Sequence, residues 1–241
     1  MPNLVIIGPG GIGRAIAREQ SARGWGISFV GRSAERLANA AAECPGASST
    51  VSDPTDIDSL PAIAPSLREL HPDGFQALVC SVGSVLLQPA HRISASAWRA
   101  VMAANLDAAF AALRLAIELM PHGGSVLLFS SGAARIGLAN HEAIAAAKAG
   151  IEGLVRSAAA TYARRNLRIN AIAPGLTDTP LAAALLASPA ARKASESFHA
   201  LGRIGDPAQV ARIAATLLDP ANDNITGSII AVDGGLGQCR V

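Results

Sequence analysis

Short apolar runs alternate with longer helix-like stretches along the chain. The apolar runs, each bounded by glycine or polar residues, cover 3–7, 26–30, 76–80, 124–129, 167–172 and 228–232. The stretches between them are rich in Ala, Leu, Arg and Glu and cover 12–23, 33–43, 56–70, 95–120, 140–164 and 207–218. Short apolar runs are typical of strands buried on both faces. The alternation predicts an α/β fold: a Rossmann-type, doubly wound parallel sheet of about seven strands with helices on both faces.

The pattern continues without a linker rich in Pro, Gly or Ser and without a repeat of 20–50 residues. We therefore expect one dinucleotide-binding domain over residues 1–241. The Ala-rich segment 180–201, which carries Pro180 and Pro189, interrupts the rhythm. It predicts a helical insertion, or lid, that faces the substrate.

Composition excludes several classes of protein. Half of the residues are apolar and 16% are charged, which excludes general disorder. A net charge of +2 and 3% aromatic residues give neither a basic surface nor a stacking platform for nucleic acid. No targeting pattern and no apolar run near the ~20 residues of a membrane span is visible. Three widely separated cysteines favour a reducing compartment and lack metal-ligand spacing. We expect a cytoplasmic protein that binds no metal, nucleic acid or membrane.

A glycine-rich turn follows the first apolar run. It consists of Gly8, Pro9, Gly10, Gly11, Ile12 and Gly13 and satisfies G-x-G-x-x-G between a predicted strand and a predicted helix. Gly8 permits a tight turn, Gly10 lets backbone approach a pyrophosphate, and Gly13 allows close helix–strand packing. The helix N-terminus beyond it offers free N–H groups to phosphate. The alternative is an ordinary strand–helix turn without a ligand.

The end of the second apolar run bears on which dinucleotide binds. A cofactor with a free 2′-hydroxyl calls for an acid about 20 residues into the unit. Here Arg32 and Ser33 follow Gly31, and no acid is present. A guanidinium pairs with a 2′-phosphate and a hydroxyl adds a donor, so we expect NADP(H). The alternative is that Arg32 is a solvated residue at a helix start; Arg14, beside Gly13, is either a second phosphate partner or a surface residue.

With these pieces placed, the chain resembles the short-chain dehydrogenase/reductase family over most of its length. The matching positions follow the family's order of motifs: the glycine turn, Asp53 after the third strand, Asn105 with Leu106 in the long helix, Ser131 after the fifth strand, Lys148, the segment 168–175 with Pro174 and Gly175, Thr179, and the segments 225–227 and 232–235. The resemblance implies that Asp53 contacts adenine, that Ser131, Lys148 and Asn105 are catalytic, and that Pro174, Gly175 and Thr179 lie beside the nicotinamide. It also implies a homodimer or homotetramer.

Two departures from the family pattern concern binding. The family usually places three residues between the first two glycines of the turn, whereas Gly8 and Gly11 enclose two. The family's Asn-Asn-Ala-Gly after the fourth strand reads Cys80-Ser81-Val82-Gly83. Gly83 is kept, and Ser81 can replace part of the lost hydrogen bonding.

The third departure concerns chemistry. The family pairs a Tyr and a Lys one helical turn apart, but Ile144 stands four residues before Lys148, and thirteen residues after Ser131. The single tyrosine, Tyr162, lies ~21 Å further along the same predicted helix at 1.5 Å per residue, so it cannot replace the missing acid. The sequence keeps the Asn, Ser and Lys of the family and lacks its Tyr.

Reduction of a ketone needs a proton from another group. Ser131 can stabilise an oxyanion, and Lys148 can relay a proton through water and the cofactor ribose. His141 lies seven residues before Lys148 and shares its helix face if the helix has begun by residue 141. The alternative is an exposed, inert His141 in the first turn beside a capping Asn140.

The residues expected around the nicotinamide are mostly small or apolar, which favours a small apolar substrate. Arg135 is the one charge there that can either hold an anionic substrate or point to solvent. The leading hypothesis is an NADP(H)-dependent oxidoreductase that transfers hydride to a carbonyl, imine or conjugated double bond, with non-standard proton delivery. The alternative is a non-catalytic NADP(H)-binding sensor or assembly subunit. A non-redox enzyme that reuses Ser131 and His141 ranks last, because no acid completes a triad.

Overall fold

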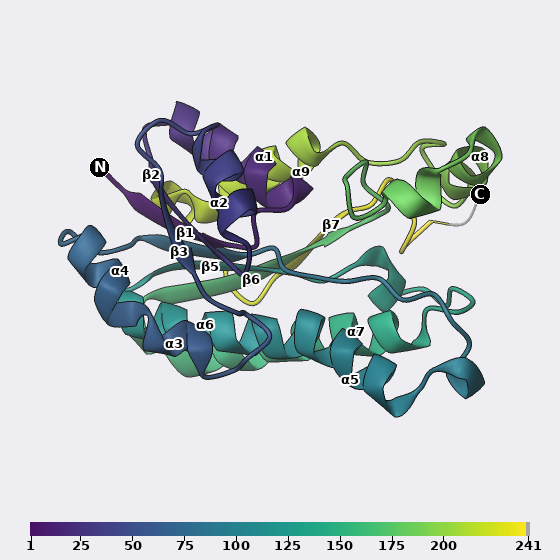
Figure 1. Cartoon of the computed structure of the whole chain (residues 1–241), viewed down its shortest axis with the longest axis horizontal. Helices are drawn as coiled ribbons and strands as arrows, with labels where there is room; N and C mark the ends of the chain where they lie inside the picture. The colour runs from purple at the N-terminus through teal and green to yellow at the C-terminus, as the bar shows by residue number, and fades with distance from the viewer. Residues whose placement is uncertain (240–241) are drawn as a thin grey trace.

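A computed structural model describes residues 1–239 of the chain (Figure 1). Its centre is a seven-stranded sheet in the order β3-β2-β1-β4-β5-β6-β7, and every neighbouring pair is parallel. The strands are β1 (Asn3–Ile7), β2 (Gly26–Gly31), β3 (Ser48–Val51), β4 (Ala77–Cys80), β5 (Gly124–Phe129), β6 (Leu167–Pro174) and β7 (Ile229–Val232). The expected Rossmann-type sheet is confirmed.

Six of the strands follow the predicted apolar runs, and β3 is the one that the runs did not reveal. In β3 half-buried positions alternate with exposed ones, because it is the edge strand and pairs only with β2. Its sequence, Ser-Ser-Thr-Val, therefore lacks the continuous apolar character of a strand buried on both faces.

Helices cover both faces of the sheet (Figure 1). The helices are α1 (Gly11–Ala22), α2 (Ala34–Ala41), α3 (Ser59–Ala62), α4 (Ala64–Leu70), α5 (Ala95–Met102), α6 (Ala108–Leu119), α7 (Glu142–Tyr162), α8 (Pro189–Ser197) and α9 (Pro207–Leu218). One apolar core lies between the sheet and α1, α2 and α9, and the other between the sheet and α3, α4, α6 and α7. The sheet is thus buried on both sides, which explains its apolar strands.

Two of the predicted helices are interrupted. The stretch 56–70 contains the short helices α3 and α4, and the stretch 95–120 contains α5 and α6 joined by a π-helical segment, Ala103–Asp107. By length and composition alone, Ala95–Leu119 is apolar enough to cross a membrane, with a mean hydropathy of 1.5 in its most apolar window. Half of that window is buried inside the fold.

The segment 180–201 is partly helical, as expected. It contains a short 3-10 turn, Ala183–Leu186, and helix α8, which Ser188 caps by accepting a hydrogen bond from the Ala191 amide. In Figure 1, α8 lies beyond the end of the sheet rather than on either face.

The strand order fixes where a ligand can lie. The chain runs outward from β1 through β2 to β3 and then crosses back to β4 on the other side of β1. In sheets of this kind, ligands bind in a crevice at this reversal of strand order, beside the loops after the two neighbouring strands, here β1 and β4. The loops after all seven strands meet along the same edge, because the strands are parallel.

Candidate functional site

The glycine turn lies at this crevice, between β1 and α1. Gly8 has a φ of +90°, a conformation that favours glycine, and its carbonyl accepts a hydrogen bond from the Gly10 amide at 2.8 Å. Gly10 is the N-cap of α1, and no side chain caps the helix. The first N–H groups of α1 therefore remain available to an anion.

Ser81, which directly follows β4, stabilises the glycine turn by a hydrogen bond. Its hydroxyl donates to the Gly8 carbonyl at 2.7 Å. Gly13 packs against the same carbonyl and the same hydroxyl so closely that a Cβ on residue 13 would overlap both. The hydrogen bond from Ser81 therefore replaces part of the bonding that the family's Asn-Asn sequence provides. The close packing on this bond requires glycine at residue 13.

Arg32 and Asp53 come together at the ends of β2 and β3. Arg32 Nε lies 3.9 Å from Asp53 Oδ1, and both side chains are substantially exposed. The hydroxyl of Ser33 accepts a hydrogen bond from the Arg36 amide at 3.3 Å as the N-cap of α2, which leaves its own hydrogen free to donate. Arg14 forms an ion pair with Glu43, so it is engaged between α1 and the end of α2.

Lys148 projects from α7 toward the carboxyl end of β5. Its Nζ donates to the carbonyl of Phe129 at 2.9 Å, and only 8% of the residue is exposed. Burial disfavours the charged amine and lowers the pKa of Lys148 to about 8, although the nearby Cys80 thiol opposes the shift. Near neutral pH this amine therefore exchanges protons far more readily than an exposed lysine does.

Asn105 and Gly83 lie beside this amine. Asn105 is buried in the π-helical segment, and its amide nitrogen donates to the Val101 carbonyl at 2.9 Å and to Ser84 Oγ at 3.2 Å. A Cβ on residue 83 would lie 3.1 Å from Asn105 Oδ1 and 3.7 Å from Lys148 Nζ. The loop after β4 thus brings the predicted Asn105, Gly83 and Lys148 into one cluster. Ser84, which the sequence predicts on the nicotinamide side, completes it.

Ser131 follows β5 two residues after the carbonyl that Lys148 binds. Its Oγ accepts a hydrogen bond from the Ala133 amide at 3.2 Å. Ile144 lies one helical turn before Lys148 on α7 and is 5% exposed. The face of α7 that carries the buried Lys148 amine therefore also carries an apolar residue, one helical turn away.

The prediction that His141 shares a helix face with Lys148 required the helix to have begun by residue 141. The structure does not meet this requirement, because His141 lies outside the helix. Helix α7 begins at Glu142, and His141 is its N-cap residue, with φ −102° and ψ 11°. Its Nδ1 donates to the Ala139 carbonyl at 2.8 Å, which leaves Nε2 available. Asn140 does not cap the helix; its φ of +64° forms the left-handed turn before it.

Arg135, which the sequence offered as a charge for an anionic substrate, is engaged in an ion pair with Glu152. Its Nε donates to Glu152 Oε1 at 3.0 Å, and the same carboxylate oxygen accepts from the Ser130 hydroxyl at 2.9 Å. Glu152 is 9% exposed on α7, four residues after Lys148. This cluster, which the sequence did not reveal, ties the strand end that carries Ser131 to the helix that carries Lys148.

The segment that follows β6 packs against the glycine turn. The side chain of Thr179 and the ring of Pro180 pack so closely on Gly11 that a Cβ there would overlap Thr179. Pro174 ends β6, and Gly175 follows it; the Gly175 amide donates to the Val232 carbonyl at 3.2 Å. The predicted Pro174, Gly175 and Thr179 therefore reach the same edge of the sheet as Gly11 and Ile12.

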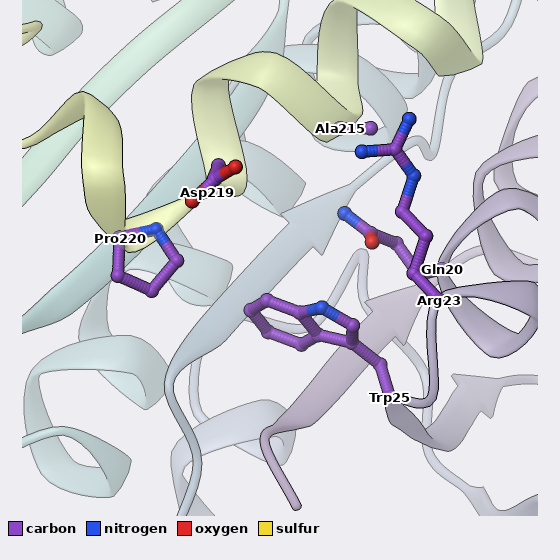
Figure 2. A pocket seen from close by; sticks show the side chains of 6 residues that line it. All are labelled: Gln20, Arg23, Trp25, Ala215, Asp219 and Pro220. Carbon is purple, nitrogen blue, oxygen red and sulfur yellow. The ribbon is translucent and has the colours of Figure 1, made fainter.

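Two cavities of the described residues lie apart from this cluster. Figure 2 shows the first, about 270 Å³, with Trp25 beneath Gln20 and Arg23 and with Asp219 and Pro220 on the opposite wall. Trp25 precedes β2, so this cavity lies at the amino edge of the sheet, opposite the glycine turn. The second, about 600 Å³, lies beside the loop 200–205 and the end of β7. Among residues 1–239, no three His, Cys, Asp or Glu side chains gather as metal ligands would.

Comparisons with known proteins agree with this geometry. A family model described as enoyl-(acyl carrier protein) reductase matches residues 7–237. The chain is 35% identical over 231 residues to a cis-4-hydroxycyclohexanecarboxylate dehydrogenase of Sinomonas cyclohexanicum, covering 93% of this chain and 92% of the relative. It superposes with a TM-score of 0.92 and 28% identity on a short-chain type dehydrogenase/reductase of Mycobacterium ulcerans, covering 99% and 90% of the two chains. An actinorhodin polyketide ketoreductase solved with NADPH shares the fold, with a TM-score of 0.91 and 23% identity.

Two of the four glycines of the turn, Gly13 and Gly10, make a matched pair for mutation. We expect Gly13→Ala to destabilise the protein by about 2 kcal/mol or more, because its Cβ would overlap the Gly8 carbonyl and the Ser81 hydroxyl. Gly10→Ala has no heavy atom within 4 Å of its Cβ, so we expect little change in the free energy of unfolding. Urea unfolding of both variants tests this, and equal losses of stability would contradict it.

The buried amine predicts a pH-dependent difference in stability between Lys148→Met and the parent protein. The unfolded chain holds the Lys148 proton up to a pKa of 10.5 and the folded chain only to about 8. Below pH 8 the parent protein is therefore destabilised by the full free energy of burying the charged amine. This destabilisation disappears as the pH rises toward 10.5, which raises the free energy of unfolding of the parent by about 3 kcal/mol.

We therefore expect the stability of Lys148→Met relative to the parent to fall by that amount between pH 7 and pH 10.5, measured by urea unfolding. Lys193→Met, at the exposed second lysine of the chain, is the control and should show no such trend. A difference for Lys148→Met that stays constant with pH would show that its amine is not desolvated.

Proposed function

Because the chain belongs to the short-chain dehydrogenase/reductase family, we propose that it is an NADP(H)-dependent oxidoreductase of the cytoplasm. It transfers hydride to a carbonyl, imine or conjugated double bond of a small, apolar substrate. The observation that carries this proposal is the cluster of Lys148, Asn105 and Gly83, which lies at the same edge of the sheet as the open glycine turn.

The residues present fit a dinucleotide. The uncapped start of α1 and the unobstructed Gly10 suit a pyrophosphate, and Thr179 packs beside them on Gly11. Arg32 and the free hydroxyl hydrogen of Ser33 suit a 2′-phosphate, and Asp53 beside Arg32 suits the adenine end. When bound, NADPH supplies the hydride.

Proton delivery has to work without a tyrosine. Ile144 occupies the position of the family's Tyr and cannot donate. The hydroxyl of Ser131 stabilises the developing oxyanion by hydrogen bonding, and the ammonium of Lys148 holds the proton that neutralises it. Lys148 suits this role because its pKa of about 8 keeps it protonated at neutral pH while making it a stronger acid than an exposed lysine.

His141 is the other candidate for the proton. Its Nδ1–H is already bound to the Ala139 carbonyl, so only the imidazolium form has a second hydrogen to give, on Nε2. The Lys148 ammonium, in contrast, has hydrogens beyond the one that the Phe129 carbonyl accepts, which favours Lys148.

The second candidate function is a non-catalytic NADP(H)-binding sensor or assembly subunit. The buried, apolar Ile144 beside Lys148 favours it, since a site that binds without reacting needs no acid. The two functions differ in one respect: only the oxidoreductase consumes NADPH when offered a panel of carbonyl, imine and enoyl compounds.

A homodimer or homotetramer is part of the proposal. Trp98 on α5 and Phe110 on α6 are 39% and 42% exposed, and we propose that these apolar side chains lie in a subunit interface. Sedimentation measures the assembly directly.

The choice between phosphorylated and unphosphorylated dinucleotide depends on Arg32. We expect Arg32→Ala to weaken NADPH binding by 10-fold or more and to leave NADH binding nearly unchanged, because it removes the partner of the 2′-phosphate. Calorimetric titration with both dinucleotides measures the ratio. Arg164→Ala, at the far end of α7, is the control; an unchanged ratio in Arg32→Ala would exclude it as the discriminating residue.

The source of the proton is visible in the pH profile of turnover. If Lys148 holds it, the rate of NADPH oxidation falls as the pH rises through about 8, since the reactive ammonium loses its proton. His141→Ala should then keep both the rate and the profile. A loss of ~10²–10⁴ in His141→Ala, with NADPH affinity unchanged, would instead assign the proton to His141.

A further inference from the structure

His199 follows α8 and is 4% exposed. Its Nδ1 lies 2.9 Å from the Ser195 carbonyl, and its Nε2 lies 3.2 Å from the Leu176 amide nitrogen. A carbonyl only accepts and an amide N–H only donates, so Nδ1 carries a hydrogen and Nε2 carries a lone pair. Only the neutral imidazole, in this one tautomer, satisfies both contacts.

The Leu176 amide belongs to the segment that closes the site. This segment, Gly175–Thr179, runs from the end of β6 to the threonine that packs on Gly11 of the glycine turn. Its far side is held by the chain after α8, where the Gly205 amide donates to the Leu176 carbonyl at 2.8 Å. His199 therefore sets the position of the segment through the remaining polar group of Leu176.

The imidazole is wedged between two glycines. A Cβ on residue 175 would lie 2.7 Å from His199 Nε2, and a Cβ on residue 234 would lie 3.5 Å from its Cδ2. The ring therefore cannot turn away easily when its charge changes. The hydrogen bond of the ring to Leu176 and its contact with Gly175 are therefore kept or lost together.

We propose that His199 is a positioning residue for the cofactor site. The neutral imidazole holds Gly175–Thr179 against the glycine turn, and protonation of the imidazole releases it. The protonated ring would point a second N–H at the N–H of Leu176, which cannot accept it. The proposal rests on the proposed function for what the segment covers, whereas the contact of His199 with Leu176 stands without it.

The charged groups around the ring offer no compensation. Arg192, Lys193 and Glu196 lie on α8, Arg203 on the chain that follows, Asp178 on the segment and Asp233 on the turn after β7. Arg192 pairs with Asp178 at 2.8 Å, and the carboxylate of Asp233 accepts from the Gly235 and Gly237 amides at 2.9 Å each. Within residues 1–239 no carboxylate forms an ion pair with His199, so nothing there rewards its protonation.

The matched variant for a test is His199→Gln. A glutamine oxygen near the place of Nε2 accepts from the Leu176 amide and stays uncharged at every pH of interest. His199→Ala removes the contact altogether. The other four histidines of the chain remain in both variants and contribute equally to any pH dependence.

The experiment measures the Kd for NADPH by calorimetry and the hydrogen-exchange protection of the Leu176 amide between pH 5.5 and 8.0. As the pH falls to 5.5, we expect NADPH binding to weaken more in the parent protein than in His199→Gln, by up to about 10-fold. The protection factor of Leu176, corrected for intrinsic exchange, should fall by a similar factor only in the parent. The 2′-phosphate of NADPH also titrates near pH 6, but this effect is common to both proteins and cancels.

Two results would overturn the proposal: the same pH dependence of Kd in the parent and in His199→Gln, or a Leu176 amide that stays equally protected at pH 5.5 and pH 8.0. Failure of the proposed function is distinguishable. In that case no protein binds NADPH at any pH, while the Leu176 amide still reports whether His199 holds the segment. If His199→Ala does not fold, the comparison with His199→Gln decides alone.

Discussion

Parallel pairing of all seven strands is the constraint on which the rest of the structure depends. It brings every strand's carboxyl end to one edge, so residues from distant parts of the chain meet there without any direct sequence relation. The strand order reverses at β1, which is where sheets of this kind bind their ligands, and the glycine turn lies there. Ser81 and Thr179 line that turn from two other strands, and Lys148 reaches the same edge from α7.

The chemistry at this edge follows from desolvation. A buried ammonium with one carbonyl partner at 2.9 Å gives up its proton more easily than an exposed one, because the surrounding protein replaces its hydration poorly. In the proposed function Ile144 takes the place of the family's tyrosine. We propose that burial, which makes the Lys148 ammonium a better proton donor, compensates for the missing hydroxyl.

Much of the fold could be predicted from the sequence, because strands that are buried on both faces have continuous apolar sequences. β3 could not, because Ser48–Val51 forms an edge strand with an ordinary polar sequence. The glycine turn and Lys148 were predictable from spacing and family resemblance. The contacts of Arg135 with Glu152 and of His199 with Leu176 were not, because each joins residues from different elements that no local pattern connects. The start of α7 at Glu142 was missed by two residues, which changed the position of His141.

We propose that the carboxyl edge of the sheet, between the glycine turn and Lys148, binds a phosphorylated nicotinamide dinucleotide. Calorimetric titration of the purified protein with NADPH is the decisive measurement, and we expect saturable binding of one dinucleotide per chain. A titration without saturable binding would contradict it, and Lys148 and the glycine turn would then be features of the fold without a cofactor to serve.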